Sequence, residues 1–187
     1  TSVSRGLGDV YKRQMQEGIG PEGQHYFPSF PYPAFSKMSE EDLLHLKDYL
    51  FSLPPIQRNN QPHELQFPFN LRLNAWFWNI LFHDPEPITP DPSRSASWNR
   101  GRCLTEAVAH CAECHTPRNQ LGVLRSDLAY AGAKEGPEGK LTPNITPDQE
   151  TGIGGWNQDD LVYALQTGMV PNGCLLYTSD AADDVAS

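Results

Sequence analysis

The pentapeptide Cys111-Ala112-Glu113-Cys114-His115 is the feature that most restricts what this chain can fold into. Two thiols at this spacing can reach the two vinyl groups on one edge of a porphyrin and form thioether links. The adjacent imidazole can then ligate the iron from the proximal side. A chain with this motif must wrap its other segments around a flat, largely apolar group. The motif therefore predicts a haem c bound through Cys111 and Cys114, with His115 as an axial ligand.

Two other uses of a C-x-x-C pair fit the surrounding sequence less well. A thioredoxin-type dithiol follows a β-strand, whereas the segment from about residue 99 to Cys111 has the apolar spacing of a helix. Half of a zinc site would need a second Cys/His pair at suitable spacing. Only His110 lies near, and we assign it no role. Haem attachment remains the favoured interpretation.

Composition excludes one class of function and agrees with a loop-rich helical protein. The 187 residues carry a net charge of −9, so no basic surface is available to neutralise phosphates and nucleic-acid binding is not expected. Seventeen prolines and fifteen glycines predict much irregular chain between short helices. No apolar run is long enough to span a bilayer. A core with so few apolar residues could use a large apolar cofactor to fill it.

A short internal repeat predicts two homologous domains. Residues 15–23 read MQEGIGPEG and residues 165–173 read LQTGMVPNG, at an offset of 150. We infer that the first domain is truncated at its start and the second at its end. The expected organisation is an extraneous tail over 1–14, the C-terminal part of an upstream haem c domain over 15–55, an interdomain linker over 56–96, a second haem c domain lacking its C-terminal end over 97–173, and a second extraneous tail over 174–187.

Helix signals occur at three places outside the pentapeptide. Ser39 and Asp42 form a capping pair before an apolar stripe of leucines, and Pro54 stops that helix. A second helix follows Asn157 and can end at Gly168. A short aromatic helix over about 76–82 is expected to pack between the domains, with a contact to a membrane surface or a partner as the alternative.

A relay haem needs a second axial ligand, and a Met thioether would stabilise the ferrous state. Met38 ends a loop stiffened by prolines, directly before the capped helix, and is predicted to serve the haem of the upstream domain. The alternative is that Met38 is an ordinary hydrophobic-staple residue. Its counterpart in the repeat would be position 188, beyond this chain. Met169 aligns with Ile19, so the haem at His115 is expected to lack its native sixth ligand here.

With these residues identified, the chain resembles the multihaem cytochrome c subunit of bacterial membrane-bound alcohol, aldehyde and gluconate dehydrogenases. The resemblance covers residues 15–173 and depends on the stretches FPYPAFSKMSEEDLLHLKDYLFSLPP, FPFNLR, WNRGRCLTEAVAHCAECHTPRNQLG and PNITPDQETGIGGW. It implies an all-α fold of class I cytochrome c-like domains, here one truncated at its N-terminus and one truncated at its C-terminus. It also implies one haem c attached in this chain and a second in the truncated upstream domain.

The resemblance assigns further residues to the haem sites. Met38 becomes the axial ligand of the upstream haem. Pro117 would offer its carbonyl to the second nitrogen of the His115 imidazole. Asn144 and Trp156 would contact the haem or its propionates, with loop formation and core packing as the respective alternatives. Cys103 departs from the family pattern, and we interpret it as a buried thiol.

The function implied is electron transfer rather than catalysis. Electrons would pass from a dehydrogenase catalytic subunit toward ubiquinone or a terminal oxidase, on the periplasmic side of the bacterial cytoplasmic membrane, with membrane association in the intact protein. One alternative is a haem c domain with open iron coordination, acting as a sensor or haem enzyme. Another is a haem-free metal or structural module.

Overall fold

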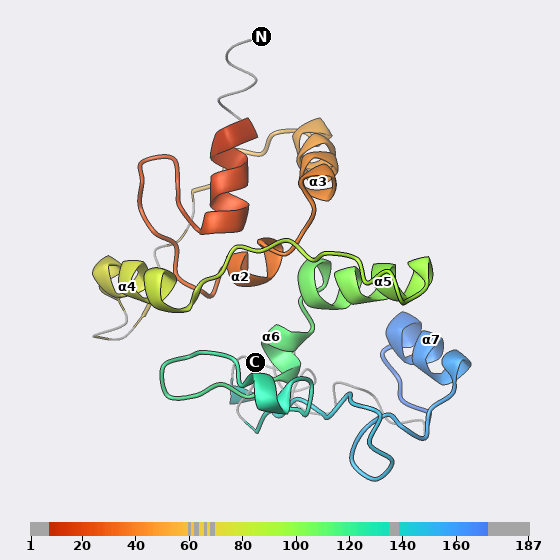
Figure 1. Cartoon of the computed structure of the whole chain (residues 1–187). Coiled ribbons are helices and arrows are strands. Elements are labelled where there is room, and N and C mark those ends of the chain that lie inside the picture. The colour runs from red at the N-terminus through yellow and green to blue at the C-terminus, as the bar shows by residue number, and fades with distance from the viewer. Residues whose placement is uncertain are drawn as a thin grey trace, which may run out of the picture.

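The computed structural model describes residues 8–59, 61, 64–65, 67, 70–134 and 139–171. Over these residues the chain is helical and forms no strand, only three isolated β-bridges, which agrees with the predicted all-α class (Figure 1). The domain boundaries and truncations remain predictions. The elements in chain order are η1 (Arg13–Glu17), α2 (Tyr32–Phe35), α3 (Glu40–Ser52), α4 (Arg72–Phe82), α5 (Ala96–Cys103), η2 (Leu104–Val108), α6 (Ala112–His115), η3 (Ser126–Leu128) and α7 (Gln158–Thr167).

The predicted capped helix is α3. The Ser39 hydroxyl oxygen accepts a hydrogen bond from the backbone N–H of Asp42 at 3.0 Å, which satisfies one of the free donors at the helix start. Leu43 is fully buried, but Leu50 and Leu53 are 45% and 46% exposed. Only the first half of the leucine stripe therefore packs against the rest of the chain.

The two copies of the repeat share a local structure. α7 begins with a capping box between Asn157 and Asp160 and ends at Gly168, whose φ of 70° is left-handed. Residues 8–12 are helical and continue into η1, which ends at Gly18 with a φ of 66°. The helix before Gly18 lies partly in the segment predicted to be extraneous. Residues 1–7 and 172–187, which contain the rest of that tail and the whole of the other, lie outside the described residues.

The helix that leads to the pentapeptide begins earlier than the sequence predicts. The Ser95 hydroxyl caps α5 by accepting from the backbone N–H of Trp98. The helix widens into the π-turn η2 and ends just before His110, a non-glycine residue with a φ of 41°. Because this conformation reverses the backbone direction, α6 leaves the end of η2 at an angle (Figure 1).

A small buried cluster forms the core. It consists of Met15, Met38, Leu43 and Ala107, which are at most 8% exposed. The first three belong to the upstream segment, and Ala107 belongs to η2. The core therefore joins the two predicted domains instead of lying inside either one. Partly buried side chains pack around it: Tyr11, Phe30, Phe35, Leu46 and Ile88.

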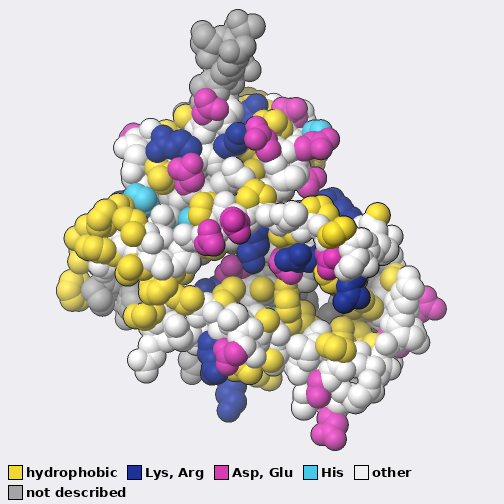
Figure 2. Space-filling view, viewed as in Figure 1, with side chains coloured by type: hydrophobic (Ala, Val, Ile, Leu, Met, Phe, Trp, Pro, Cys, Tyr) yellow, Lys and Arg dark blue, Asp and Glu magenta, His cyan; other side chains and the backbone are white. Residues whose placement is uncertain are grey.

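The aromatic helix predicted over 76–82 is α4, and it contacts segments on both sides of the linker. Its Asn79 amide donates to the Glu17 carbonyl at 2.8 Å, and its Trp78 indole N–H donates to the Leu121 carbonyl at 3.0 Å. Figure 2 shows hydrophobic side chains gathered over this helix. None of the helices among the described residues is long and apolar enough to cross a membrane. The exposed apolar side chains of α4 are Leu73, Trp76, Phe77, Ile80, Leu81 and Phe82.

Candidate functional site

The short helix α6 brings the three chemically active groups of the pentapeptide to one side. Cys111 is its N-cap, and its backbone N–H donates to the Thr105 carbonyl at 2.9 Å, which ties the turn to η2. The His115 backbone N–H donates to the Cys111 carbonyl at 3.0 Å. Residues three and four apart on a helix share a face, so Cys111, Cys114 and His115 can act on one bound group.

The imidazole of His115 has a defined partner. Its Nδ1 lies 2.8 Å from the carbonyl oxygen of Pro143, which can only accept a hydrogen bond. Nδ1 therefore carries the proton, and the lone pair of Nε2 is available for a metal. The sequence predicted Pro117 for this role, and the structure corrects it. The carbonyl of Pro117 instead accepts the backbone N–H of Arg125 at 2.9 Å.

Thr142 holds the Pro143 segment against the pentapeptide. Its hydroxyl donates to the Cys114 carbonyl at 2.6 Å and accepts from the Ala133 backbone N–H at 3.1 Å. On the other side, the Gly132 backbone N–H donates to the His115 carbonyl at 2.8 Å. A side chain at Gly132 would meet the Thr142 carbonyl at 2.7 Å, so this close approach requires glycine. The carbonyl facing the imidazole is thus fixed from both sides.

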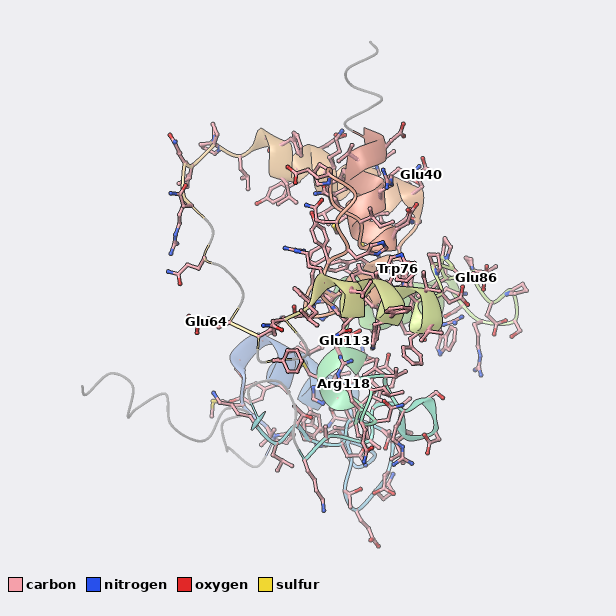
Figure 3. All side chains as sticks on the ribbon, turned by 90° about the vertical axis from the view of Figure 1, so that its left-hand side faces the viewer. Glu40, Glu64, Trp76, Glu86, Glu113 and Arg118 are labelled. Carbon is pink, nitrogen blue, oxygen red and sulfur yellow. The ribbon has the colours of Figure 1, made fainter. Side chains whose placement is uncertain are left out.

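Three more side chains fix the chain that follows α6. Thr116 is 3% exposed, and its hydroxyl oxygen accepts the Tyr130 backbone N–H at 3.0 Å. Glu113, inside the pentapeptide, forms an ion pair with Arg118, and the two side chains lie close together below α4 in Figure 3. Arg118 also donates to the Gly122 carbonyl at 2.7 Å. The motif is therefore braced by the loop that follows it.

The thiols fit covalent attachment of a haem. Cys111 and Cys114 are both free and half-buried, so neither is held in a disulfide. Burial raises the pKa of the Cys111 thiol, and repulsion from Cys114 adds to this effect. The Cys111 side chain therefore remains a neutral thiol at neutral pH. Large apolar side chains are exposed on η2 and in the later loops, as a site for an apolar group requires: Leu104, Val108, Leu121 and Leu141.

The other predicted site residues contact their own surroundings. The Asn144 carbonyl oxygen accepts the backbone N–H of Thr146, and its amide donates to Thr151 at 2.9 Å, so its side chain closes its own loop. Trp156 is half-buried. Met38 is 3% exposed in the core cluster. Contacts of these three residues with a haem remain predictions.

Residues that the sequence analysis did not select complete the site. The sequence gives no sign that the Pro143 carbonyl lies beside His115, because 28 residues separate them and the acceptor is backbone. Pro143 does begin the stretch PNITPDQETGIGGW, on which the resemblance partly depends. That position was the one available signal for the contribution of this loop.

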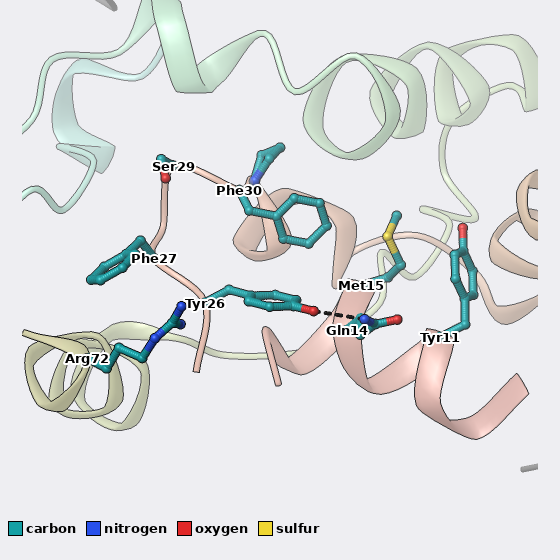
Figure 4. A pocket seen from close by; sticks show the side chains of 9 residues that line it. Tyr11, Gln14, Met15, Tyr26, Phe27, Ser29, Phe30 and Arg72 are labelled. Carbon is teal, nitrogen blue, oxygen red and sulfur yellow. Dashed lines mark hydrogen bonds between the residues drawn. The ribbon is translucent and has the colours of Figure 1, made fainter. Parts of the chain in front are cut away.

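A separate cavity of about 580 Å³ lies on the upstream side (Figure 4). The Gln14 amide donates to the Tyr26 hydroxyl at 2.8 Å across it. None of the predicted haem-attachment residues lines this cavity, so it is not part of the pentapeptide site. Its lining consists of Tyr11, Gln14, Met15, Tyr26, Phe27, Ser29, Phe30, Pro31 and Arg72.

Comparison with known proteins identifies relatives of this chain. No family model matches the chain. A diheme cytochrome c-type protein of Cereibacter sphaeroides is 39% identical over 159 residues, which are 84% of this chain and 52% of that protein. The fructose dehydrogenase cytochrome subunit of Gluconobacter japonicus is 34% identical over 89% of this chain and 35% of its own length. The gluconate 2-dehydrogenase cytochrome c subunit of Pantoea cypripedii is 29% identical over 87% of this chain and 40% of its length.

This chain is a homologue of c-type cytochromes. The resemblance inferred from the sequence is thereby confirmed, since the relatives include cytochrome c subunits of fructose, gluconate and alcohol dehydrogenases. The chain spans about half the length of the diheme cytochrome and less of the other relatives. The homology with c-type cytochromes implies a haem c cofactor.

Proposed function

We propose that this chain carries single electrons on a haem c attached through Cys111 and Cys114, with His115 as the proximal iron ligand. One observation carries the proposal: two free thiols and an imidazole lie on α6 and its N-cap, and the Pro143 carbonyl accepts the Nδ1 proton, which leaves the lone pair of Nε2 available for a metal. The homologous cytochrome c subunits support the same function.

The bound haem supplies the one-electron chemistry, and the residues of this chain bind and orient it. The two cysteines retain the haem through cycles of oxidation and reduction. The hydrogen bond from Nδ1 of His115 to Pro143 fixes the rotation of the imidazole and raises its basicity. Exposed apolar side chains of η2, which precedes α6, would exclude water from the bound group, among them Leu104 and Val108. We also propose that Asn144 and Trp156 contact the haem or its propionates.

The second proposed haem belongs to the upstream domain, with Met38 as its axial ligand. The name of the diheme relative supports more than one haem in the intact protein. Met38 follows the Pro-rich loop, and its backbone N–H donates to the Phe35 carbonyl at 3.0 Å, so its position is well defined.

The electrons are proposed to come from a dehydrogenase catalytic subunit and to pass toward ubiquinone or a terminal oxidase. Relatives bear the names of dehydrogenase cytochrome subunits and of a nicotinate dehydrogenase subunit, which supports such a partner. We place the intact protein on the periplasmic side of the cytoplasmic membrane, associated with that membrane. Among the named relatives nothing supports the alternative of a sensor or haem enzyme.

Haem attachment is tested by producing the chain in a bacterial host with cytochrome c maturation. A pyridine haemochrome spectrum should show haem c, and the haem should stay with the polypeptide on a denaturing gel. The double variant Cys111→Ala/Cys114→Ala should lose this covalent haem, whereas the control Cys103→Ser should keep it. A colourless parent protein with Cys111 and Cys114 both open to alkylation would refute the proposal.

A further inference from the structure

The core of the described residues connects the two proposed haem segments directly. Met38, the proposed ligand of the upstream haem, is 3% exposed, and Ala107, four residues before Cys111, is fully buried in the same cluster. Packed protein atoms therefore fill the space between the Met38 segment and the helix leading to the pentapeptide. An electron passes more readily through packed or bonded atoms than across an open gap.

One ring contact also connects the Met38 segment with the residue directly before Cys111. The Met38 backbone N–H donates to the Phe35 carbonyl at 3.0 Å. The Phe35 ring meets the His110 ring edge-on, with centroids 5.7 Å apart and planes at 75°. His110 is joined to Cys111 by a peptide bond. One hydrogen bond, one ring contact and one covalent link thus lead from Met38 to an attachment cysteine.

His110 is held in an unusual way for this contact. Its φ of 41° is left-handed, a conformation that a residue with a side chain adopts only when its surroundings impose it. Its carbonyl accepts the Glu113 backbone N–H at 2.9 Å, so the strained residue also forms the first turn of α6. The same backbone constraint therefore positions both the ring and the attachment helix.

A cavity lies beside the contact between the Phe35 and His110 rings. A cavity of about 210 Å³ separates the segment holding Pro33 and Lys37 from the side of α6 that carries Glu113, and His110 lies on its wall. A route through the cavity would cross unfilled or hydrated space. Beside this cavity, the packed atoms that connect the Met38 segment with Cys111 are therefore those of Phe35 and His110.

We propose that Phe35 and His110 form the path by which electrons cross between the Met38 segment and Cys111. The proposal depends on the proposed function, because it requires a haem on each side. In the step, the donor haem would lose one electron and be oxidised, and the acceptor haem would gain that electron and be reduced. No covalent bond forms or breaks, and no proton is transferred, so the two residues act as packed conducting contacts and not as catalytic residues.

The test uses a photochemical electron donor in place of the upstream haem. Glu41 is exposed on α3, three residues after Met38, and Glu41→Cys provides a site for a ruthenium photosensitiser. Cys103 and Cys174 are replaced by Ser so that the label attaches at one position. Flash photolysis of the haem-loaded chain then measures the rate of electron transfer from the label to the haem at His115.

Phe35→Leu and His110→Asn should each lower this rate several-fold, and the double variant should lower it little further, because both changes interrupt one path. Asn tolerates the left-handed backbone at position 110. Phe35→Tyr keeps the ring and should keep the rate. Phe51→Leu, at a position 62% exposed on the labelled helix, is the matched control and should leave the rate unchanged.

Haem content, absorption spectrum and midpoint potential are measured for every variant, and all should match the parent, because the path residues are not ligands. Unchanged rates in Phe35→Leu and His110→Asn at full haem content would overturn the path while leaving the electron-carrier proposal intact. If His110→Asn does not take up haem, the electron-transfer rates of Phe35→Leu and Phe35→Tyr are compared instead. Equal rates in these two variants would overturn the proposed path. A parent chain that takes up no haem contradicts the proposed function itself.

Discussion

The hydrogen bond between His115 and Pro143 shows how single residues prepare the site. A free imidazole has two tautomers and can rotate, whereas here a backbone carbonyl at 2.8 Å selects one tautomer and one ring orientation. That carbonyl is held in turn by the neighbouring Thr142, whose hydroxyl spans the gap to the Cys114 carbonyl. The orientation of the His115 imidazole thus depends on Thr142 as well as on Pro143.

Thr142→Val tests this support, because it keeps the shape of the side chain and removes its hydrogen bonds. The Cys114 carbonyl loses this partner in a partly buried place, whereas the Ala133 N–H keeps its bond to the Thr142 backbone carbonyl, so the free energy of unfolding should fall by about 1–3 kcal/mol. Denaturant titration of the haem-loaded chain measures the change. Thr105→Val, which loses one exposed bond to Gly101, is the control and should stay within about 0.5 kcal/mol. Equal losses in both would contradict the bracing role.

For single residues, the sequence predicts which side chains are reactive better than it predicts which atoms they contact. The spacing of Cys111, Cys114 and His115 identifies the reactive groups because their local geometry is that of one helical turn. The partner of the imidazole was assigned to Pro117 and proves to be Pro143. A backbone acceptor has no residue-specific signature, and its approach depends on how a distant loop folds back.

Among the elements, the two left-handed glycines show how similar helix ends differ in their surroundings. Gly18 and Gly168 occupy equivalent places in the repeat and have nearly the same φ, 66° and 70°. A side chain at Gly18 would come within 2.7 Å of the fully buried Tyr32 ring, whereas nothing lies within 4 Å at Gly168. The first helix end is therefore built into the packing and the second is not.

This difference predicts unequal effects of the same substitution. Gly168→Ala should cost only the backbone strain, about 1–2 kcal/mol. Gly18→Ala should cost that strain and, in addition, about 1–3 kcal/mol for forcing a methyl group against the Tyr32 ring. Denaturant unfolding followed by circular dichroism compares the two variants. The packing argument fails if Gly168→Ala is the more destabilising change.

α4 stabilises the end of η1 with side chains. Helix ends leave backbone carbonyls without partners, and here Asn79 donates to Glu17 while Nε2–H of His83 donates to Gln16 at 2.6 Å. Burial lowers the pKa of His83 below its ordinary value of 6.5, and this outweighs the hydrogen bond and the nearby carboxylates, which act in the opposite direction. Its Nδ1 is buried without a partner among the described residues, so a proton there would be poorly accommodated.

The sign of this pKa shift predicts how stability varies with pH. Below about 6.5 the unfolded chain binds a proton at His83 that the folded chain resists, so the free energy of unfolding should decrease as the pH falls through this value. His83→Gln keeps a donor for Gln16 but cannot titrate, and should flatten this part of the profile. Urea unfolding at a series of pH values measures it. His45→Gln, at an exposed position, should keep the parent profile, and a parent slope retained in His83→Gln would contradict the assignment.

Helix starts were predictable where a side chain caps them and less so elsewhere. Ser39 and Asn157 mark the beginnings of α3 and α7 because their side chains accept the first free N–H groups. α4 begins at Arg72, four residues before the expected start. Its N-cap residue, Leu71, makes no side-chain hydrogen bond to the helix, so no capping residue in the sequence marks where α4 starts. The π-turn η2 has no comparable signal in the sequence.

For the whole molecule, the small core and the large exposed apolar surface predict that haem contributes much of the stability. A group that binds only the folded chain shifts the unfolding equilibrium toward it. The haem-loaded parent should therefore melt at a higher temperature than Cys111→Ala/Cys114→Ala, and the variant should melt over a broader range. Thermal melts followed by far-ultraviolet circular dichroism measure both. Cys103→Ser should melt like the parent, and an equally sharp and high transition in the double variant would contradict this role of haem.

The overall class was predictable because the pentapeptide, the many prolines and the helix caps all indicate short helices joined by loops. The position of the core was not, because nothing in the residues near Ala107 shows that this side chain meets Met38 and Leu43. Contacts of this kind depend on how separate segments come together, and a small residue such as Ala107 gives little local indication of its partner.

The left-handed residue before the attachment helix has a mechanical consequence. His110 lies between η2, whose Ala107 is buried in the core, and α6, which holds the reactive side chains. The left-handed backbone of His110 therefore fixes the angle between these two helices. A change in the orientation of α6 relative to η2 would require a change in the backbone conformation of His110. A redox group attached to α6 would therefore keep a constant distance from the Met38 segment. The rate of electron transfer between that group and the Met38 segment would then vary little from one molecule to the next.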